Sequence, residues 1–214
     1  MKAVILLVIA LLASPGAPLP AGQKIIDRMA ARVNDDVILM SDIRELGKYQ
    51  QLVNGKSESD AQLLDRLIDQ WIVRTEAETA RFPRPSSADV ERSLQKLKDS
   101  FADPQDYERH REQAGLSTDE VKLLVDSQLY LSSYLDSRFR PLVHVEQKAI
   151  DEFYNENVVP MAKARGQAPP TLEASTDAIQ EALTQKGIDE QADRWLKESR
   201  ARIQVQNFLD ESPR

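Results

Sequence analysis

The hydrophobic pattern of residues 27–43 changes from the two-residue period of a strand to the longer period of a helix. Met29, Ala31 and Val33 fall at every second position, which is typical of a strand with one buried face. The predicted order is a strand at 29–33, an Asn-Asp turn at 34–35, a return strand at 37–40 and a helix capped by Ser41-Asp42. Because a lone hairpin is only marginally stable in water, we expect a distant segment to extend or cover it.

Most of the remaining chain has apolar residues at spacings of three and four, the pattern of amphipathic helices. Ser59 with Gln62, and Ser117 with Glu120, have the spacing of a capping box at a helix start. The predicted helices begin near residues 41, 59, 86, 103, 117, 146, 174 and 188, and the longest is at about 117–139. Gly187 is either a break between the last two helices or an interior glycine that costs about 1 kcal/mol relative to alanine.

Strict alternation returns near the end of the chain, at residues 201–206, where Ile203 and Val205 are expected to point inward. This strand is the natural partner for the opening hairpin. A count of only 7 glycines also argues against an architecture rich in sheets and turns. The predicted fold class is therefore mainly α, with a small antiparallel sheet formed by an N-terminal hairpin and a C-terminal strand.

The first 21 residues are typical of a secretory signal peptide. Lys2 precedes an unbroken apolar run at 3–13, and small residues with prolines follow at 14–21. Eleven apolar residues are too few to span a bilayer, which favours a cleaved signal over the alternative of an uncleaved anchor. This pattern predicts an exported protein. The chain has no cysteine, so the sequence offers no lipid-attachment cysteine and no disulfide framework.

The charge balance limits the classes of partner. The formal net charge is −7, so no basic surplus is available to displace the counterions of a nucleic acid. A net acidic body also disfavours binding to anionic lipid surfaces, and we expect no direct membrane insertion after signal removal. Nothing in the sequence sets the oligomeric state.

Six segments resemble the N-terminal chaperone region of the SurA family, periplasmic helpers of outer-membrane protein biogenesis, and its C-terminal helix and strand. They are DRMAARVNDDVILMSDI (27–43), LLDRLIDQWIVRTEA (63–77), SSADVERSLQKL (86–97), REQAGLSTDEVKLLVDSQLYLSSYL (111–135), VEQKAIDEFYNEN (145–157) and ADRWLKESRARIQVQ (192–206). The resemblance rests on their order and spacing, because no single motif is diagnostic. It implies a SurA-like helical chaperone core.

The chain departs from this family pattern between residues 143 and 174. SurA-like proteins usually carry parvulin-type prolyl isomerase domains there, and such a domain needs roughly ninety residues. Only about thirty residues are present. We therefore expect a single SurA-like chaperone domain at 22–214, made of an N-terminal region (22–157), a loop that replaces the isomerase domain (158–173) and a C-terminal helix and strand (174–214).

Residues suited to catalysis are few. His110 and His144 are the only histidines, and no serine and acid are spaced to form a triad with either of them. No grouping has metal-ligand spacing, and no glycine-rich loop could hold a phosphate. We therefore predict no catalytic residue, no metal and no cofactor.

A chaperone that holds unfolded chains needs exposed apolar or aromatic surface. The candidate client-binding residues are Tyr107, Tyr130, Tyr134, Phe139 and Met161, with core packing as the alternative role of the aromatic side chains. Tyr130 and Tyr134 lie at the edge of the apolar stripe and are the better candidates for a groove.

The predicted function is that of a periplasmic chaperone that binds unfolded outer-membrane or envelope proteins without prolyl isomerase activity. One alternative is a degenerate prolyl isomerase whose residual activity would depend on His110 or His144. Another is an envelope adaptor that docks a partner protein, which could supply an isomerase.

Overall fold

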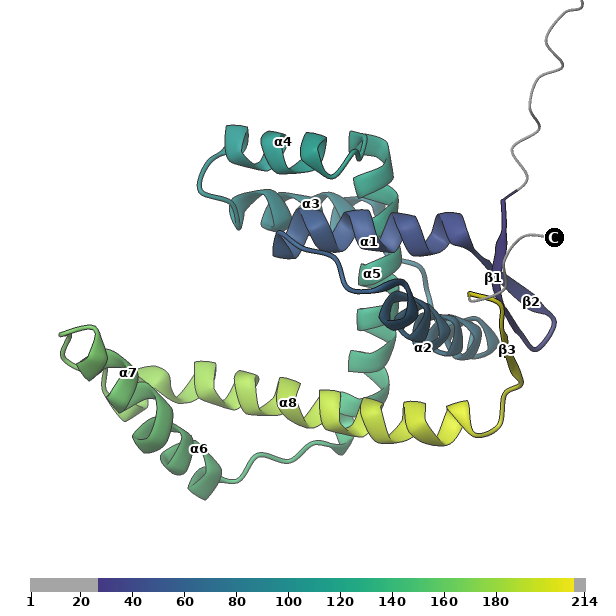
Figure 1. The fold of residues 1–214 in the computed structure, drawn as a ribbon. Helices are drawn as coiled ribbons and strands as arrows, with labels where there is room; N and C mark the ends of the chain where they lie inside the picture. The colour runs from purple at the N-terminus through teal and green to yellow at the C-terminus, as the bar shows by residue number, and fades with distance from the viewer. Residues whose placement is uncertain (1–26, 210–214) are drawn as a thin grey trace, which may run out of the picture.

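The computed structural model describes residues 27–209, which form a mainly helical body with one small antiparallel sheet (Figure 1). The elements are β1 (Met29–Val33), β2 (Asp36–Leu39), α1 (Met40–Asn54), α2 (Asp60–Thr79), α3 (Ser87–Asp99), α4 (Pro104–Gln113), α5 (Thr118–Phe139), the 3-10 turn η1 (Arg140–Leu142), α6 (Gln147–Phe153), the π-helical turn η2 (Tyr154–Val158), α7 (Val159–Ala164), α8 (Leu172–Arg200) and β3 (Val205–Asn207). The predicted fold class is confirmed. The expected signal peptide at 1–21 lies outside the described residues.

The C-terminal strand closes the sheet, as the sequence predicts, but β3 begins at Val205, and residues 201–204 of the predicted strand are not part of it. The strand order is β2-β1-β3, and β3 pairs antiparallel with β1 in a register that places Ala31 opposite Asn207 and Val33 opposite Val205. Asn34, at φ 52° in the hairpin turn, joins the hairpin to the segment that precedes β3. Its backbone N–H donates to the carbonyl oxygen of Gln204 at 2.8 Å, and its side-chain oxygen accepts from the Gln204 N–H at 2.9 Å. The turn therefore contributes to the β1–β3 connection as well as to the hairpin.

Some strand side chains point to a different face of the sheet than the sequence predicts. A register shift between Met29 and Ala31 interrupts the alternation, so Ala30 and Ala31 are both buried while Met29 is 39% exposed. Val205 was expected to point inward but is 43% exposed. A bulge turns neighbouring side chains to the same face, and a period-2 pattern cannot reveal it. The predicted alternation is wrong at these positions.

The start of α1 also lies earlier than predicted. The helix begins at Met40 with Leu39 as its N-cap, so the prediction that Ser41-Asp42 forms the cap is wrong. The carboxylate of Asp42 instead reaches back from the third helical position and accepts the Leu39 N–H at 2.7 Å. An acid at this position satisfies a backbone donor of the first turn and complements the helix dipole.

The other predicted helix boundaries are largely confirmed. Ser59 with Gln62 and Ser117 with Glu120 form capping boxes, and Gly55 ends α1 at φ 70°. Asp103 caps α4, whose first residue is a proline. Local side chain-to-backbone bonds fix these ends, so the sequence alone is enough to locate them.

The C-terminal region contains one long helix where two were expected. α8 runs for 29 residues, longer than the 22 residues of α5, and Gly187 is an interior residue. A Cβ built at Gly187 would lie 2.6 Å from Cγ1 of Val143, in the connector between η1 and α6. The glycine is therefore required by close packing between the connector and α8, and the helix continues through it.

The predicted loop at 158–173 is mostly helical. The chain passes from α6 through η2 into α7 as far as Ala164, and α8 already begins at Leu172. Pro160 is near the start of α7, where a missing backbone N–H costs little. Pro160, which favoured a loop when only the sequence was considered, is thus compatible with the start of a helix. The segment between the two helices is 165–171.

α5 is the central element of the body (Figure 1). It contacts α2, α3 and α8. One buried cluster joins the sheet to α1 and α2, and a second joins α3, α4 and α5. α6 and η2 pack against the N-terminal part of α8, and α7 continues from η2, away from the sheet (Figure 1). The helices that separate the two strand signals therefore form one connected body.

Tyr107 provides a test of the second cluster. Its ring is buried, and its hydroxyl has no hydrogen-bond partner among the described residues. An unsatisfied buried hydroxyl costs about 1–3 kcal/mol, so we expect Tyr107→Phe to leave the free energy of unfolding unchanged or to raise it. Tyr134→Phe is the matched control, because the Tyr134 hydroxyl accepts from Arg138 at 2.8 Å. Urea unfolding should show a loss of about 1–2 kcal/mol for the control alone.

Glu58 gives a pH test of the α1–α2 connection. Hydrogen bonds from Arg66 and then Gln50 lower the pKa of Glu58 to about 2 from 4.5. A carboxyl whose pKa is depressed in the folded state stabilises the fold above its unfolded-state pKa, and this contribution is lost as the pH falls from about 4.5 to about 2. Glu58→Gln should therefore make the fall in urea midpoint over this window shallower. Glu45→Gln should follow the wild-type curve, because the Glu45 carboxylate has no ion pair among residues 27–209.

Candidate functional site

The structure buries four of the five predicted client-binding residues. Tyr107, Tyr130, Tyr134 and Phe139 are each no more than 5% exposed, and only Met161 is open to solvent. The four buried rings are not brought together on one surface, since Tyr107 belongs to α4 and the other three to different levels of α5. The prediction that these aromatic side chains form exposed binding surface is wrong.

Tyr130 and Tyr134 are covered by the segment between α2 and α3. The ring of Phe82 lies 6.0 Å from that of Tyr130 and 5.5 Å from that of Tyr134. The guanidinium of Arg84 lies over the Tyr130 ring at 4.1 Å. An irregular segment has no periodic pattern of apolar residues, so nothing in the sequence indicates that it covers these two rings.

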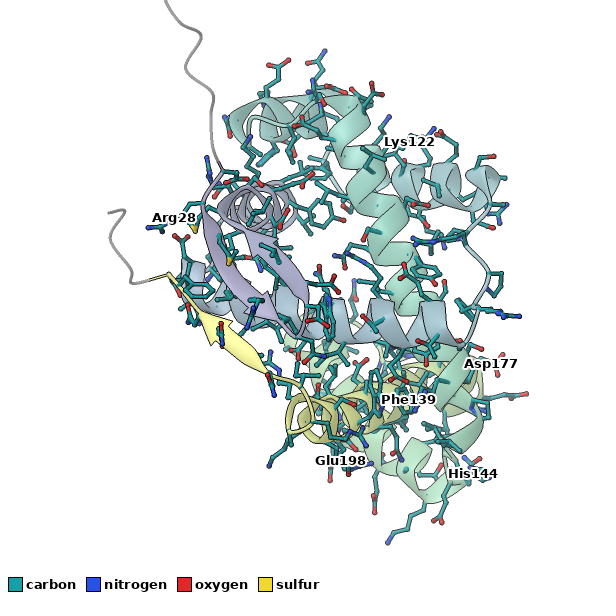
Figure 2. The ribbon with its side chains drawn as sticks, turned by 90° about the vertical axis from the view of Figure 1, so that its right-hand side faces the viewer. Arg28, Lys122, Phe139, His144, Asp177 and Glu198 are labelled. Atoms are coloured by element: carbon teal, nitrogen blue, oxygen red, sulfur yellow. The ribbon has the colours of Figure 1, made fainter. Side chains whose placement is uncertain are left out.

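Phe139 is buried in the core, whereas Met161 lies at the surface. Phe139 is at the junction of α5 and α8, where its ring is 5.9 Å from that of Trp195 (Figure 2). Met161 is 54% exposed on α7 and lines none of the hollows described below. Of the predicted set, Met161 alone is available for surface contact.

The most exposed large apolar side chain among the described residues is one that the sequence analysis did not select. Leu123 is 67% exposed on α5. It lies between two hollows in the surface and lines both of them. Its sequence signal was available, because Leu123 falls outside the stripe of Val121, Leu124 and Val125 and so places a leucine on the polar side of the helix.

The first hollow lies between the hairpin and helices α1, α2 and α5. It has a volume of about 310 Å³, and its apolar lining includes Leu46, Leu67 and Trp71. Trp71 also donates its ring N–H to the Asp36 carboxylate at 2.8 Å, which ties α2 to the start of β2. Four elements, β2, α1, α2 and α5, therefore supply the walls of this hollow.

The second hollow lies between the start of α3 and α5, on the other side of Leu123. Its volume is about 480 Å³, and Pro85, Val90 and Leu123 supply apolar lining. Lys122 lies on α5 (Figure 2). Its ammonium pairs across to the carboxylate of Glu91 on α3. The hydrogen bond from the Lys122 ammonium lowers the pKa of the Glu91 carboxyl. This ion pair links the two helices that form the walls of the hollow.

The geometry supports binding, and no catalytic constellation is assembled from the described residues. The Nδ1 atom of His110 lies 2.8 Å from the backbone carbonyl of Asp106 within α4, and His144 is exposed in the connector before α6. These two segments lie at opposite ends of α5 (Figure 1). Within residues 27–209, no group of three or more His, Asp or Glu side chains could hold a metal ion. No helix in this range is long and apolar enough to cross a membrane.

No protein-family model matches this sequence, and no curated protein is significantly similar to it. The resemblance to the SurA family therefore stays a hypothesis that rests on the order and spacing of the six quoted segments.

Proposed function

We propose that this protein is an exported, non-enzymatic chaperone that binds unfolded outer-membrane or envelope proteins in the periplasm. Such binding requires apolar surface that is accessible without unfolding of the chaperone. The single observation that carries the proposal is the exposed side chain of Leu123 between two hollows. Export and the envelope clients rest on the N-terminal sequence pattern and on the SurA resemblance.

Shallow contacts of this kind suit weak and unselective binding. A leucine that is two-thirds exposed in the free protein gains hydrophobic stabilisation when a client covers it, at about 25 cal/mol per Å² of apolar surface. The hollows on either side offer room for neighbouring client side chains without a deep, shape-selective pocket. Affinity would then come from several small apolar contacts and require no nucleotide.

The direct test is suppression of aggregation. The purified protein without residues 1–21 should slow the aggregation of a β-barrel protein diluted from urea, and Leu123→Gln should reduce this effect several-fold. Gln is a good helix former at an exposed site, so the fold should be kept. Leu142→Gln is the matched control, because Leu142 is 60% exposed and lines neither hollow beside Leu123.

Failure of the wild-type protein to slow aggregation would overturn the proposal. Equal activity of the Leu123→Gln and wild-type proteins would instead move the binding surface away from α5. Photocrosslinking in cells from positions 123 and 161 would then identify the bound proteins. Crosslinks to many different proteins would support a chaperone, whereas crosslinks to one stoichiometric partner would favour the envelope adaptor.

The isomerase alternative predicts a different result. Turnover of a proline-containing peptide that is abolished by His110→Ala or His144→Ala would favour a degenerate isomerase. The two histidines lie on separate elements, so activity that depends on both of them would contradict the described fold.

A further inference from the structure

Building on the proposed function, we propose that the hollow between α3 and α5 binds an extended polypeptide segment in which an apolar residue lies between two basic residues. The apolar side chain would contact Leu123, Val90 and Pro85. The two cations would meet the carboxylates of Asp119 and Asp126, which also line the hollow.

The two carboxylates flank the exposed leucine on one face of α5. Asp119 precedes Leu123 by four residues, and Asp126 follows it by three, which are the spacings of neighbours on a helix surface. Neither aspartate side chain makes a hydrogen bond or an ion pair within residues 27–209. Both negative charges are therefore available to a partner.

The nearest cation of the hollow is already engaged. The Lys122 ammonium pairs with Glu91 of α3, and Asp119 adds only a weaker electrostatic attraction to it. Filling the hollow with a neutral apolar segment would leave the two aspartates without a counter-charge. An acidic segment would add like-charge repulsion, which disfavours binding. The charge around the hollow is thus complementary to a basic partner.

The spacing of the aspartates sets the expected spacing of the cations. Seven helical residues rise about 10.5 Å at 1.5 Å each, which separates Asp119 from Asp126 along α5. In an extended segment of polyproline II conformation, which has three residues per turn and rises about 3.1 Å per residue, residues three positions apart point to the same side about 9 Å apart. Basic residues three positions apart therefore match the two carboxylates, and a leucine between them lies within reach of Leu123.

The experiment compares two labelled twelve-residue peptides by fluorescence anisotropy with the protein lacking residues 1–21. One contains Lys-Leu-Ser-Lys in a Ser/Thr background, and the other has Glu in place of both lysines. Exposed ion pairs contribute about 0.2–1 kcal/mol each, so two pairs predict a roughly two- to thirty-fold tighter Kd for the lysine peptide at low salt. This preference should shrink in about 0.5 M NaCl because of screening.

The variant Asp119→Asn/Asp126→Asn should remove the preference. Asp177→Asn/Asp193→Asn makes the same change in net charge at exposed positions of α8 and should leave it intact. Leu123→Gln should weaken both peptides. Because Asp119 lies in the first turn of α5, Asp126→Asn alone is also measured, with a thermal melt as the check on folding.

The outcomes separate this inference from the proposed function. If neither peptide binds and the protein also fails to slow aggregation, the proposed function fails. If aggregation is slowed but the two peptides bind equally, or the preference survives Asp119→Asn/Asp126→Asn, the inference about this hollow is wrong and the proposed function stands.

Discussion

Removing residues 201–214 should lower the free energy of unfolding by about 4 kcal/mol or more, a large share of the stability of a typical domain. The deletion removes β3 and its ladder with β1, and also the Asn34–Gln204 bonds that join the hairpin turn to the C-terminal segment. It also removes Ile203 and Leu209, which pack against the buried cluster of the sheet, α1 and α2. Each half-buried aliphatic side chain contributes about 1 kcal/mol, and the lost backbone bonds add to this.

Urea unfolding measures the loss, and hydrogen exchange locates it. Without β3, the amides of Arg32 on β1 and of Asn34 in the hairpin turn should exchange much faster than in the full chain. A deletion of residues 210–214 alone is the control, because it leaves every described contact of β3 in place. If the chain that ends at Arg200 kept wild-type stability and protection, the closing role of β3 would be wrong.

Gly187→Ala should destabilise the protein by about 1–3 kcal/mol, although alanine is the better helix former by about 1 kcal/mol. The added methyl group would meet the side chain of Val143 at 2.6 Å and 3.0 Å, closer than nonbonded carbon atoms approach. Backbone or side-chain movement must then separate the connector from α8. Thermal and urea unfolding would measure the change.

A double mutant isolates the contact. Val143→Ala removes both γ-methyl groups, so Gly187→Ala in that background should recover most of the loss. Val143→Ala alone provides the reference for the lost valine packing. A Gly187→Ala protein as stable as wild type would show that the connector can move away from α8 at little cost.

The closing of the sheet could be predicted from the sequence because it depends on few signals. Two segments at opposite ends of the described chain carry strand patterns, and an isolated hairpin is marginal. Pairing them was the simplest solution, and β1 does lie between β2 and β3. The exposure of Met29 and Val205 could not be predicted from the sequence. It depends on a local register shift for Met29 and on the position of the edge strand for Val205.

The candidate site was harder to predict than the fold. Helical spacing placed Tyr130 and Tyr134 at the edge of a stripe, but their burial depends on Phe82 from an irregular segment. Leu123 is exposed because neither α2 nor α3 covers its part of α5, although both helices pack against α5. Burial is a property of all neighbours together, whereas a helical period describes a single element.

The sequence by itself determined most of the helices, most of their caps, the hairpin and the presence of a closing strand, because short-range hydrogen bonds and periodic burial set these features. Only the tertiary structure decided that α8 continues through Gly187, that four predicted aromatic side chains are core residues, and that Leu123 remains exposed between two hollows. These features depend on contacts between segments far apart in the chain, and the local pattern of residues does not encode which segments meet.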